Sequence, residues 1–167
     1  RITYTLNIDE QSMVIIPRTE ESKAPKWTLL SESKCDACPL KGKKRCPVAV
    51  NLWDILDTFK TVVSFKKCKV TVETKERTFV KKTDIQTGLG SLLGLIMATS
   101  DCPTLEFFRP MARFHLPFAS TEETVFRHLG NFLIGEYLKG DISKEKINDE
   151  LRRRYEKINK VNSQLLE

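Results

Sequence analysis

The chain has 167 residues, of which 40% are hydrophobic and 30% are charged, and its net charge is +6. This length and composition predict one soluble globular domain with its own core, and leave too little chain for two ordinary domains. No apolar run reaches the roughly 20 residues of a membrane-spanning helix. The chain also shows no basic-then-apolar leader, so we expect no signal peptide and a cytoplasmic location.

The first elements expected are two short strands. Residues 2–8 alternate apolar and polar side chains, which is typical of a half-buried strand. A polar turn follows, and residues 13–16 form a returning apolar strand that ends at Pro17. The chain therefore begins with a predicted hairpin.

Four cysteines are the candidates for a metal site: Cys35, Cys38, Cys46 and Cys102. The first three are spaced C-x2-C-x7-C, and a C-x2-C pair places two thiolates on one turn, as in the first half of a metal clip. The chain has five cysteines, an odd number that argues against a fully disulfide-paired framework. Cys68 is left out, because it lies in an alternating strand pattern where a free thiol behaves as a small hydrophobe.

The identity of the metal stays open between Zn²⁺ and a [4Fe–4S] cluster, with no metal as the third possibility. Zinc is the commoner staple of small domains and tolerates varied spacing. Proline follows Cys38, Cys46 and Cys102, and a Cys-Pro pair is familiar at cubane clusters. Four thiolates leave no open coordination position, so either cofactor predicts a structural or electron-transferring site and not a hydrolytic one.

A helix from Pro47 to about Lys60 is expected next, since proline suits the first helical position and apolar residues follow at helical spacing. Residues 65–72 and 78–80 predict a second hairpin. Basic residues concentrate around these elements, in a candidate polyanion-binding patch that consists of Lys41, Lys43, Lys44, Arg45, Lys66, Lys67, Lys69, Lys81 and Lys82. A solvated surface is the simpler explanation, because a nucleic-acid-binding patch requires both basic segments to share one face.

Asp84 is expected to cap a helix over residues 85–99. Its glycines (Gly88, Gly90 and Gly94) follow a GxGxxxG pattern, but no Gly-Lys-Ser/Thr ending and no strand–turn–helix fingerprint accompanies them. Close packing of this helix on a neighbour explains the glycines better than nucleotide binding does. The helix ends just before Cys102, so a four-cysteine site would tie it to the N-terminal loop.

The irregular segment that follows contains a second candidate site. Arg109, Arg113 and His115 are residue types that can hold a phosphate or a carboxylate. Alternatively, the two arginines pair with Glu122 and Glu123 and hold the segment onto the last helices, which is the interpretation we favour. With two histidines and no recognisable arrangement of a nucleophile with a base, the sequence does not indicate an enzyme.

Two helices are expected to complete the chain. Ser120 and Glu123 form a capping box at the start of the first, which runs to about Lys139 and stops at Gly140. Its apolar face consists of Val125, Leu129, Phe132, Leu133 and Tyr137. The stripe of the second helix consists of Ile147, Leu151, Ile158, Val161 and Leu165. We predict a single domain over residues 1–140, with a Cys-rich loop at 35–47, and an amphipathic helix over 141–167 that packs on this domain or on a partner.

Six strings of residues stand out along the chain: Trp27-Thr28, Cys35-x2-Cys38-Pro-Leu, Cys46-Pro-Val-Ala, Gly88-Leu-x-Ser91-Leu-x-Gly94-Leu, Arg109-Pro-Met-Ala-Arg113-x-His115-Leu-Pro-Phe-Ala119 and Glu122-Glu-Thr-x-Phe-Arg127. Together they resemble a family of bacterial domains of unknown function, over about Ile2 to Leu138. The resemblance implies a bacterial source and a domain that recurs as a unit. It assigns no activity and no role to any residue.

The predicted fold is α+β: an antiparallel sheet made from the two hairpins packs against about four helices, and a four-cysteine metal site staples the N-terminal loop to the central helix. The predicted function is that of a non-catalytic bacterial module for protein interaction or assembly, with another protein as its partner. Two alternatives remain, a domain that binds nucleic acid or another polyanion and an iron–sulfur redox or sensor protein. An interaction module should expose an apolar patch, for which the C-terminal helix is the first candidate. The sequence identifies no small-molecule substrate.

Overall fold

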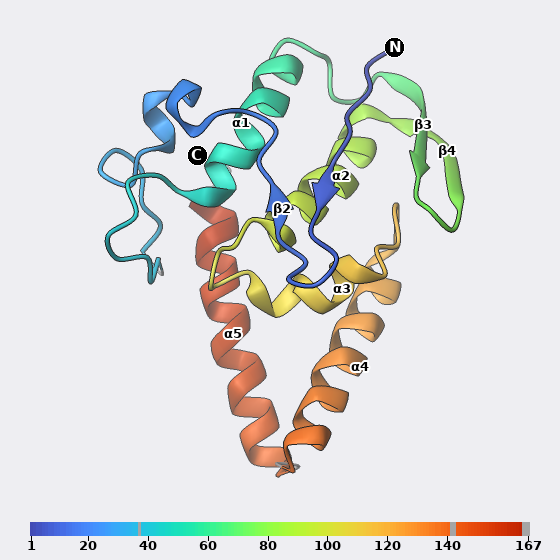
Figure 1. Ribbon diagram of the computed structural model, residues 1–167. Coiled ribbons are helices and arrows are strands. Elements are labelled where there is room, and N and C mark those ends of the chain that lie inside the picture. The colour runs from blue at the N-terminus through green and yellow to red at the C-terminus, as the bar shows by residue number, and fades with distance from the viewer. Residues whose placement is uncertain (37, 141–142, 165–167) are drawn as a thin grey trace.

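The computed structural model describes residues 1–36, 38–140 and 143–164. Over these residues the chain is α+β, with five α-helices and two separate two-stranded antiparallel sheets (Figure 1). The strands are β1 (Asn7–Ile8), β2 (Ile15–Ile16), β3 (Lys67–Glu73) and β4 (Thr78–Asp84). The helices are α1 (Pro47–Phe59), α2 (Ile85–Thr99), α3 (Arg109–Arg113), α4 (Thr121–Lys139) and α5 (Lys144–Gln164), with short 3-10 helices at Glu21–Lys23, Lys26–Thr28 and Glu106–Phe108. Within the described ranges, none of these helices combines the length and the apolar character needed to cross a membrane.

The core lies where α1, α2 and the end of α5 meet. Ile55 of α1 and Ile96 of α2 are completely buried, and Ile158 and Val161 of α5 belong to the same cluster. Burial of each such side chain contributes about 1.5–3 kcal/mol. Over this stretch α5 therefore packs on its own domain, one of the two predicted arrangements. Leu165, the last residue of the predicted stripe, lies outside the described residues.

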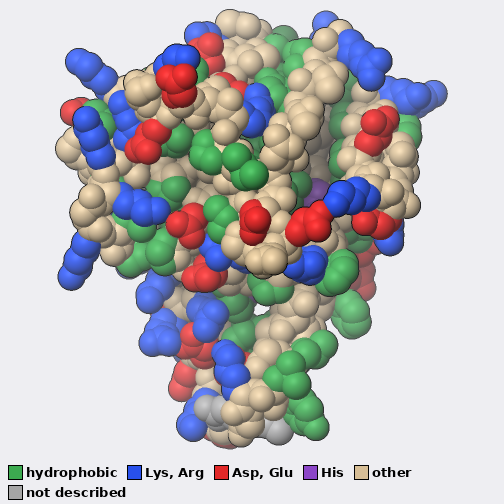
Figure 2. Space-filling view, viewed as in Figure 1, with side chains coloured by type: hydrophobic (Ala, Val, Ile, Leu, Met, Phe, Trp, Pro, Cys, Tyr) green, Lys and Arg blue, Asp and Glu red, His purple; other side chains and the backbone are tan. Residues whose placement is uncertain are grey.

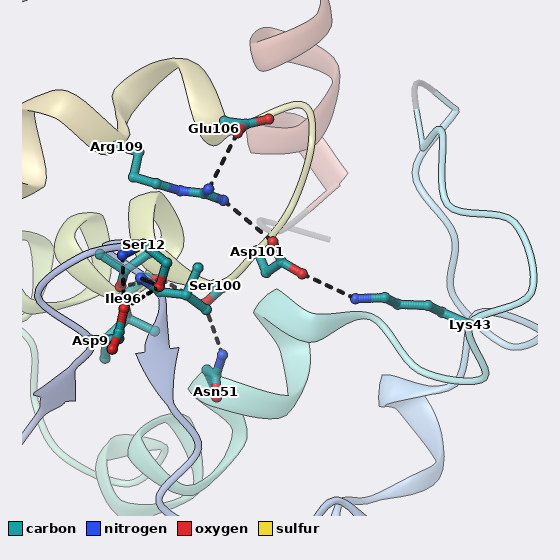
Figure 3. Close-up of polar contacts among 11 residues, drawn as sticks. Asp9, Ser12, Lys43, Asn51, Ile96, Ser100, Asp101, Glu106 and Arg109 are labelled. Atoms are coloured by element: carbon teal, nitrogen blue, oxygen red, sulfur yellow. Dashed lines mark hydrogen bonds and ion pairs between the residues drawn. The ribbon is translucent and has the colours of Figure 1, made fainter.

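A polar contact holds the end of α2 against α1. Asn51 Nδ2 donates a hydrogen bond of 3.1 Å to Ser100 Oγ, and this hydroxyl donates in turn to Ile96 O at 2.5 Å (Figure 3). Ser100 is 1% exposed, so its hydroxyl needs such partners inside the protein. The two bonds fix the direction in which the chain leaves α2.

Both predicted hairpins form, but they do not join into one sheet. β1 and β2 pair through two residues on each strand, whereas β3 and β4 pair along seven. The turn of the first hairpin depends on Asp9, whose Oδ1 accepts hydrogen bonds of 2.7 Å from both the backbone N–H and the hydroxyl of Ser12. Leu6 and Ile8 pack on the helical core, while the β3–β4 hairpin projects to one side of the molecule (Figure 1). The prediction of a single sheet was wrong, because each hairpin packs against helices and not against the edge of the other.

α4 and α5 form a V that projects from the rest of the molecule (Figure 1). The predicted capping box is present at the start of α4: Ser120 Oγ accepts from the Glu123 N–H at 3.1 Å, and Glu123 Oε2 accepts from the Ser120 N–H at 2.7 Å. Gly140 ends α4 with a φ of 79°, a conformation that carries no steric penalty for glycine. The two helices diverge from this point, so each keeps a face that the other does not cover.

Close packing explains one of the three glycines of α2. A Cβ on Gly88 would lie 2.9 Å from Cγ2 of Val70 in β3, which is too close for two carbon atoms. Nothing lies within 4 Å of a Cβ built on Gly90 or Gly94. The predicted close approach is therefore present at Gly88, where it lets the β3–β4 hairpin sit directly on α2.

Candidate functional site

The four candidate cysteines lie near the junction of the Cys-rich loop with α1 and α2. The Cys38 N–H donates to Cys35 O at 2.8 Å, which closes the expected turn between them. Cys46 immediately precedes α1, and its N–H donates to Thr28 O at 2.8 Å. Cys102 follows the end of α2, is 6% exposed, and lies in the core cluster against which Cys35 and Cys46 pack. The fold thus brings the distant Cys102 into the same cluster as two cysteines of the loop.

The thiols influence one another, but the structure shows no metal site. Burial, together with the neighbouring Cys38, Cys102 and Cys46, raises the pKa of the Cys35 thiol to about 11. Burial also raises the pKa of Cys46. The residues that the structure describes contain no group of three or more His, Cys, Asp or Glu side chains placed to hold a metal ion. The four-cysteine staple predicted as part of the fold is therefore not shown, and it stays a proposal.

A chain of ion pairs links the Cys-rich loop to the segment after α2 (Figure 3). Lys43 Nζ lies 3.3 Å from Asp101 Oδ2, and Arg109 Nη2 lies 3.4 Å from Asp101 Oδ1. Arg109 Nη1 also lies 3.2 Å from Glu106 Oε1. Exposed pairs of this kind contribute about 1 kcal/mol or less each. They orient the loop beside Cys102 but are too weak to hold it there alone.

Arg109 and Arg113 line one surface hollow of about 280 Å³, yet both guanidinium groups already have partners within the protein. Arg109 pairs with the two carboxylates just described, and Arg113 donates to the backbone oxygen of Glu10. The predicted pairing with Glu122 and Glu123 was wrong in its partners, because Glu123 caps its own helix. Both arginines hold the irregular segment in place, as the favoured interpretation expected, but through different residues.

His115, the third member of the predicted anion site, does not line this hollow. Its Nε2 lies 3.4 Å from Ser91 Oγ of α2. Burial, with repulsion from Arg127, lowers the pKa of His115 to about 4, so the ring is neutral at physiological pH. A neutral histidine that packs on α2 supplies no charge for an anion, and the three predicted residues do not form one site.

The nine basic residues of the predicted polyanion patch fall into two groups on opposite sides of the molecule (Figure 1). Four precede α1, and five lie on or beside the β3–β4 hairpin. α1 has 13 residues and is therefore about 20 Å long, which keeps the groups apart. Some of these charges are also engaged within the chain: Arg45 donates to Pro25 O at 2.8 Å, and Lys81 lies 5.8 Å from the ring centroid of Phe118. The two basic segments are therefore well separated, and a nucleic-acid-binding patch that includes both stays a prediction.

A surface that the sequence did not predict lies on the side of α4 that faces away from α5. We call it the α4 face and define it by five apolar side chains that are 46% to 79% exposed: Phe126, Leu133, Ile134, Tyr137 and Leu138. Figure 2 shows apolar side chains gathered over this helix. At 3.6 residues per turn they span an arc of about 140° from Leu133 to Leu138, which also includes Gly130 and, between Ile134 and Leu138, Arg127. The opposite side of α4 carries His128 and Phe132, which are 2% and 6% exposed.

The position of this face corrects two predictions. Leu133 and Tyr137 were expected to face the core, but the core-facing side of α4 is the one that carries Phe132. The exposed patch was expected on the C-terminal helix, but α5 buries Ile158 and Val161 of its stripe in the core. The sequence did contain one indication of an exposed apolar face, because α4 has more apolar positions than one buried stripe needs.

His128 fixes the inner side of α4. Its Nδ1 lies 2.5 Å from the Tyr155 hydroxyl of α5, and its ring centroid lies 4.3 Å from that of Phe107 and 4.6 Å from that of Phe108. Burial, with repulsion from Arg154, lowers the pKa of His128 to about 4. The residue is thus a neutral packing group that joins α4 to α5.

A groove of about 560 Å³ lies between α4 and α5. Much of the charge that lines it is paired: Glu150 with Arg153 and Arg154, and Lys139 with Glu136 at 2.8 Å. Ion pairs within and between turns of the same helix stabilise that helix. The lining therefore favours a structural role for the groove over a role in ligand binding.

The whole chain, residues 1–167, matches the model of the DUF6901 family, which is described as a domain of unknown function. The chain therefore belongs to this family, and the resemblance to uncharacterised domains is confirmed. The predicted bacterial source stays a prediction. No curated protein and no solved structure matches the chain.

Proposed function

We propose that this member of the DUF6901 family is a non-catalytic protein-interaction module that docks another protein on the α4 face. The observation that carries the proposal is the exposure of this face, where five large apolar side chains are 46% to 79% exposed on one helix. Monomeric proteins rarely expose contiguous apolar patches larger than a few hundred Å², and larger ones mark interaction sites. Transfer of such a surface from water into an interface is favourable by roughly 25 cal/mol per Å².

The contacts that hold α4 against the rest of the protein also fit a docking role for the α4 face. On the inner side of the helix, the ring of Phe132 meets that of Phe107 edge-on, with centroids 5.5 Å apart. Arg127 donates to Met111 O at 3.3 Å and so ties the start of α4 to α3. A helix held in this way presents its outer side chains in a fixed arrangement. Little conformational entropy is then lost on binding, which favours affinity.

Site-specific photo-crosslinking in the cells that produce the full chain tests the proposal. Phe126, which is 79% exposed on the α4 face, is replaced by the photoreactive residue p-benzoylphenylalanine. Phe65, which is 76% exposed in the loop before β3, is replaced in the same way as the matched control. We expect a covalent protein adduct of defined mass from position 126 and none from position 65. No adduct at 126, or equal adducts at both positions, would overturn the proposal.

The second part of the proposal concerns the cysteines. A Zn²⁺ ion or a [4Fe–4S] cluster held by Cys35, Cys38, Cys46 and Cys102 would staple the Cys-rich loop to the end of α2. The packing of Cys102 in one cluster with Cys35 and Cys46 supports this assignment. Binding requires the thiols to lose their protons and to move closer together. The free energy of binding of a structural zinc ion, about 10–16 kcal/mol, is large enough to drive such an adjustment of a loop.

Elemental analysis and a visible absorbance spectrum of anaerobically purified protein test the staple. We expect either zinc, with no visible absorbance, or iron and sulfide in a coloured sample that dithionite bleaches. Cys102→Ser should lose the metal, whereas Cys68→Ser, in β3, should retain it. Metal-free protein with reduced thiols would reject the staple and leave the proposal about the α4 face unaffected.

A further inference from the structure

We infer that the partner on the α4 face is a second copy of this chain, bound with its α4 antiparallel to the first. The inference rests on the proposed function, because it names the protein that occupies the docking surface. Its first support is a spacing: Phe126, Gly130, Leu133 and Tyr137 follow one another at intervals of four, three and four residues. This is the heptad spacing with which two helices pack side chains into each other's gaps. We call these four residues the seam.

The sizes of the seam residues fit an antiparallel pair. If two copies of α4 cross about a two-fold axis at the middle of the seam, Phe126 faces Tyr137 of the second copy and Gly130 faces its Leu133. A large side chain then meets the smallest residue in the centre, and an aromatic pair closes each end. A Cβ on Gly130 would meet nothing within 4 Å, so the space in front of it is open to the second copy. A parallel pair would set Gly130 against Gly130 and leave a void, which weakens packing.

The area of the α4 face is close to what a stable dimer requires. Phe and Tyr bury about 150–250 Å² each when fully covered, and Leu and Ile fall towards the lower end of this range. Exposed fractions of 46% to 79% over five residues therefore leave roughly 600 Å² available on each copy. A standard stable interface buries about 800 Å² per partner. Ile134 and Leu138, which flank the seam, supply part of this area and would close over its side.

The charges at the two ends of α4 favour the same arrangement. The first turn of α4 contains Glu122 and Glu123, whereas Lys139 in the last turn lines the groove on the inner side of the helix and is paired with Glu136. Antiparallel packing keeps the two acidic first turns apart and sets the two helix macrodipoles in opposite directions. A parallel pair would bring the acidic ends together. One patch that is complementary to itself gives a closed dimer and not a filament.

Sedimentation of the purified full chain tests self-association. We expect a dimer at micromolar concentrations. Leu133→Glu should raise the dissociation constant at least about tenfold, because it would bury unpaired carboxylates in an apolar seam. Phe65→Glu changes an apolar residue that is 76% exposed away from α4, and it should leave the constant unchanged. Circular dichroism of each variant verifies that it is folded, which is expected because Leu133 is 46% exposed in the single chain. A dissociation constant unaffected by Leu133→Glu would overturn the inference.

Mass spectrometry of the adduct formed at position 126 tests the orientation. An antiparallel pair should attach this position to the peptide of the second copy that contains Tyr137. Attachment to the peptide around position 126 would overturn the antiparallel arrangement. A monomeric wild-type chain combined with an adduct to a different protein would overturn self-association and leave the proposed function standing. A monomeric chain without any adduct would overturn both.

Discussion

Replacement of Ile158 by alanine should destabilise the whole domain, because this side chain joins α5 to the core. Ile158 is 4% exposed and lies in one cluster with Ile55 and Ile96. The substitution removes three carbon atoms, and at about 0.8 kcal/mol for each buried CH₂ the lost transfer free energy is roughly 2.4 kcal/mol. The cavity left behind adds about 1 kcal/mol. We therefore expect the free energy of unfolding to fall by about 3–4 kcal/mol.

Urea unfolding followed by circular dichroism measures this change. Ile2→Ala removes the same atoms from a side chain that is 55% exposed, and it should change the free energy of unfolding by less than about 1 kcal/mol. A loss below about 1 kcal/mol for Ile158→Ala would refute the packing of α5 on its own domain. A separate unfolding transition at low urea concentration, in which only part of the helical signal is lost, would refute it as well, because it would show that α5 unfolds independently of the core.

Three further predictions concern α2, α4 and the pH dependence of stability. Gly90→Ala should raise the free energy of unfolding by up to about 1 kcal/mol, since helix propensity improves and the new Cβ is unobstructed. Gly88→Ala should lower the free energy of unfolding by about 1 kcal/mol, because its Cβ would lie 2.9 Å from Val70 Cγ2. If denaturant titrations show the same change for Gly88→Ala as for Gly90→Ala, the close approach of Gly88 to Val70 is contradicted. Burial lowers the folded-state pKa of His128 to about 4 from 6.5, so the unfolded state binds a proton first as the pH falls. His128 should therefore lower the stability by about 2 kcal/mol from pH 6.5 towards pH 4, and His115, whose pKa burial also lowers to about 4, adds a decrease in the same direction. The pH slope should be shallower in His128→Phe than in the wild type; a wild-type slope in that variant would exclude the contribution of His128. Ser120→Ala should lower the free energy of unfolding by about 1 kcal/mol, and an unchanged denaturation midpoint would rule out a contribution from the capping box.

Features formed by close neighbours in the chain could be predicted from the sequence. Asp84 caps α2 by accepting a hydrogen bond of 2.9 Å from the Thr87 N–H. The capping box at Ser120 and the left-handed Gly140 set the two ends of α4. The β3–β4 hairpin likewise forms where it was predicted, although β4 continues to Asp84, beyond the predicted residues 78–80. Each feature depends on hydrogen bonds and backbone conformations within a few residues, so the residue types alone are sufficient to indicate it.

For the cysteines, only the local part of their arrangement could be predicted from the sequence. Their spacing identified Cys35 and Cys38 as one turn, and the structure contains that turn. The approach of Cys102 to the loop depends on how α1 and α2 pack, which residue spacing does not encode. It is Ile55 and Ile96, packed in the core between these helices, that bring the end of α2 to the loop.

Which side of α4 is buried also depends on residues far away in the chain. Apolar residues occur around most of this helix, so periodicity alone does not distinguish an inner side from an outer one. α5 and the aromatic residues before α3 cover the side that carries His128 and Phe132, and the α4 face is left in solvent on the other side. The separation of the two basic segments has a similar origin, since the rigid length of α1 lies between them. Local hydrogen bonding therefore determines the helices and turns of this protein, and the sequence alone indicates them. Its exposed apolar face and the separation of its basic segments arise from long-range packing. Only the tertiary structure decides these features, because the burial of a side chain depends on neighbours that are far away in the sequence.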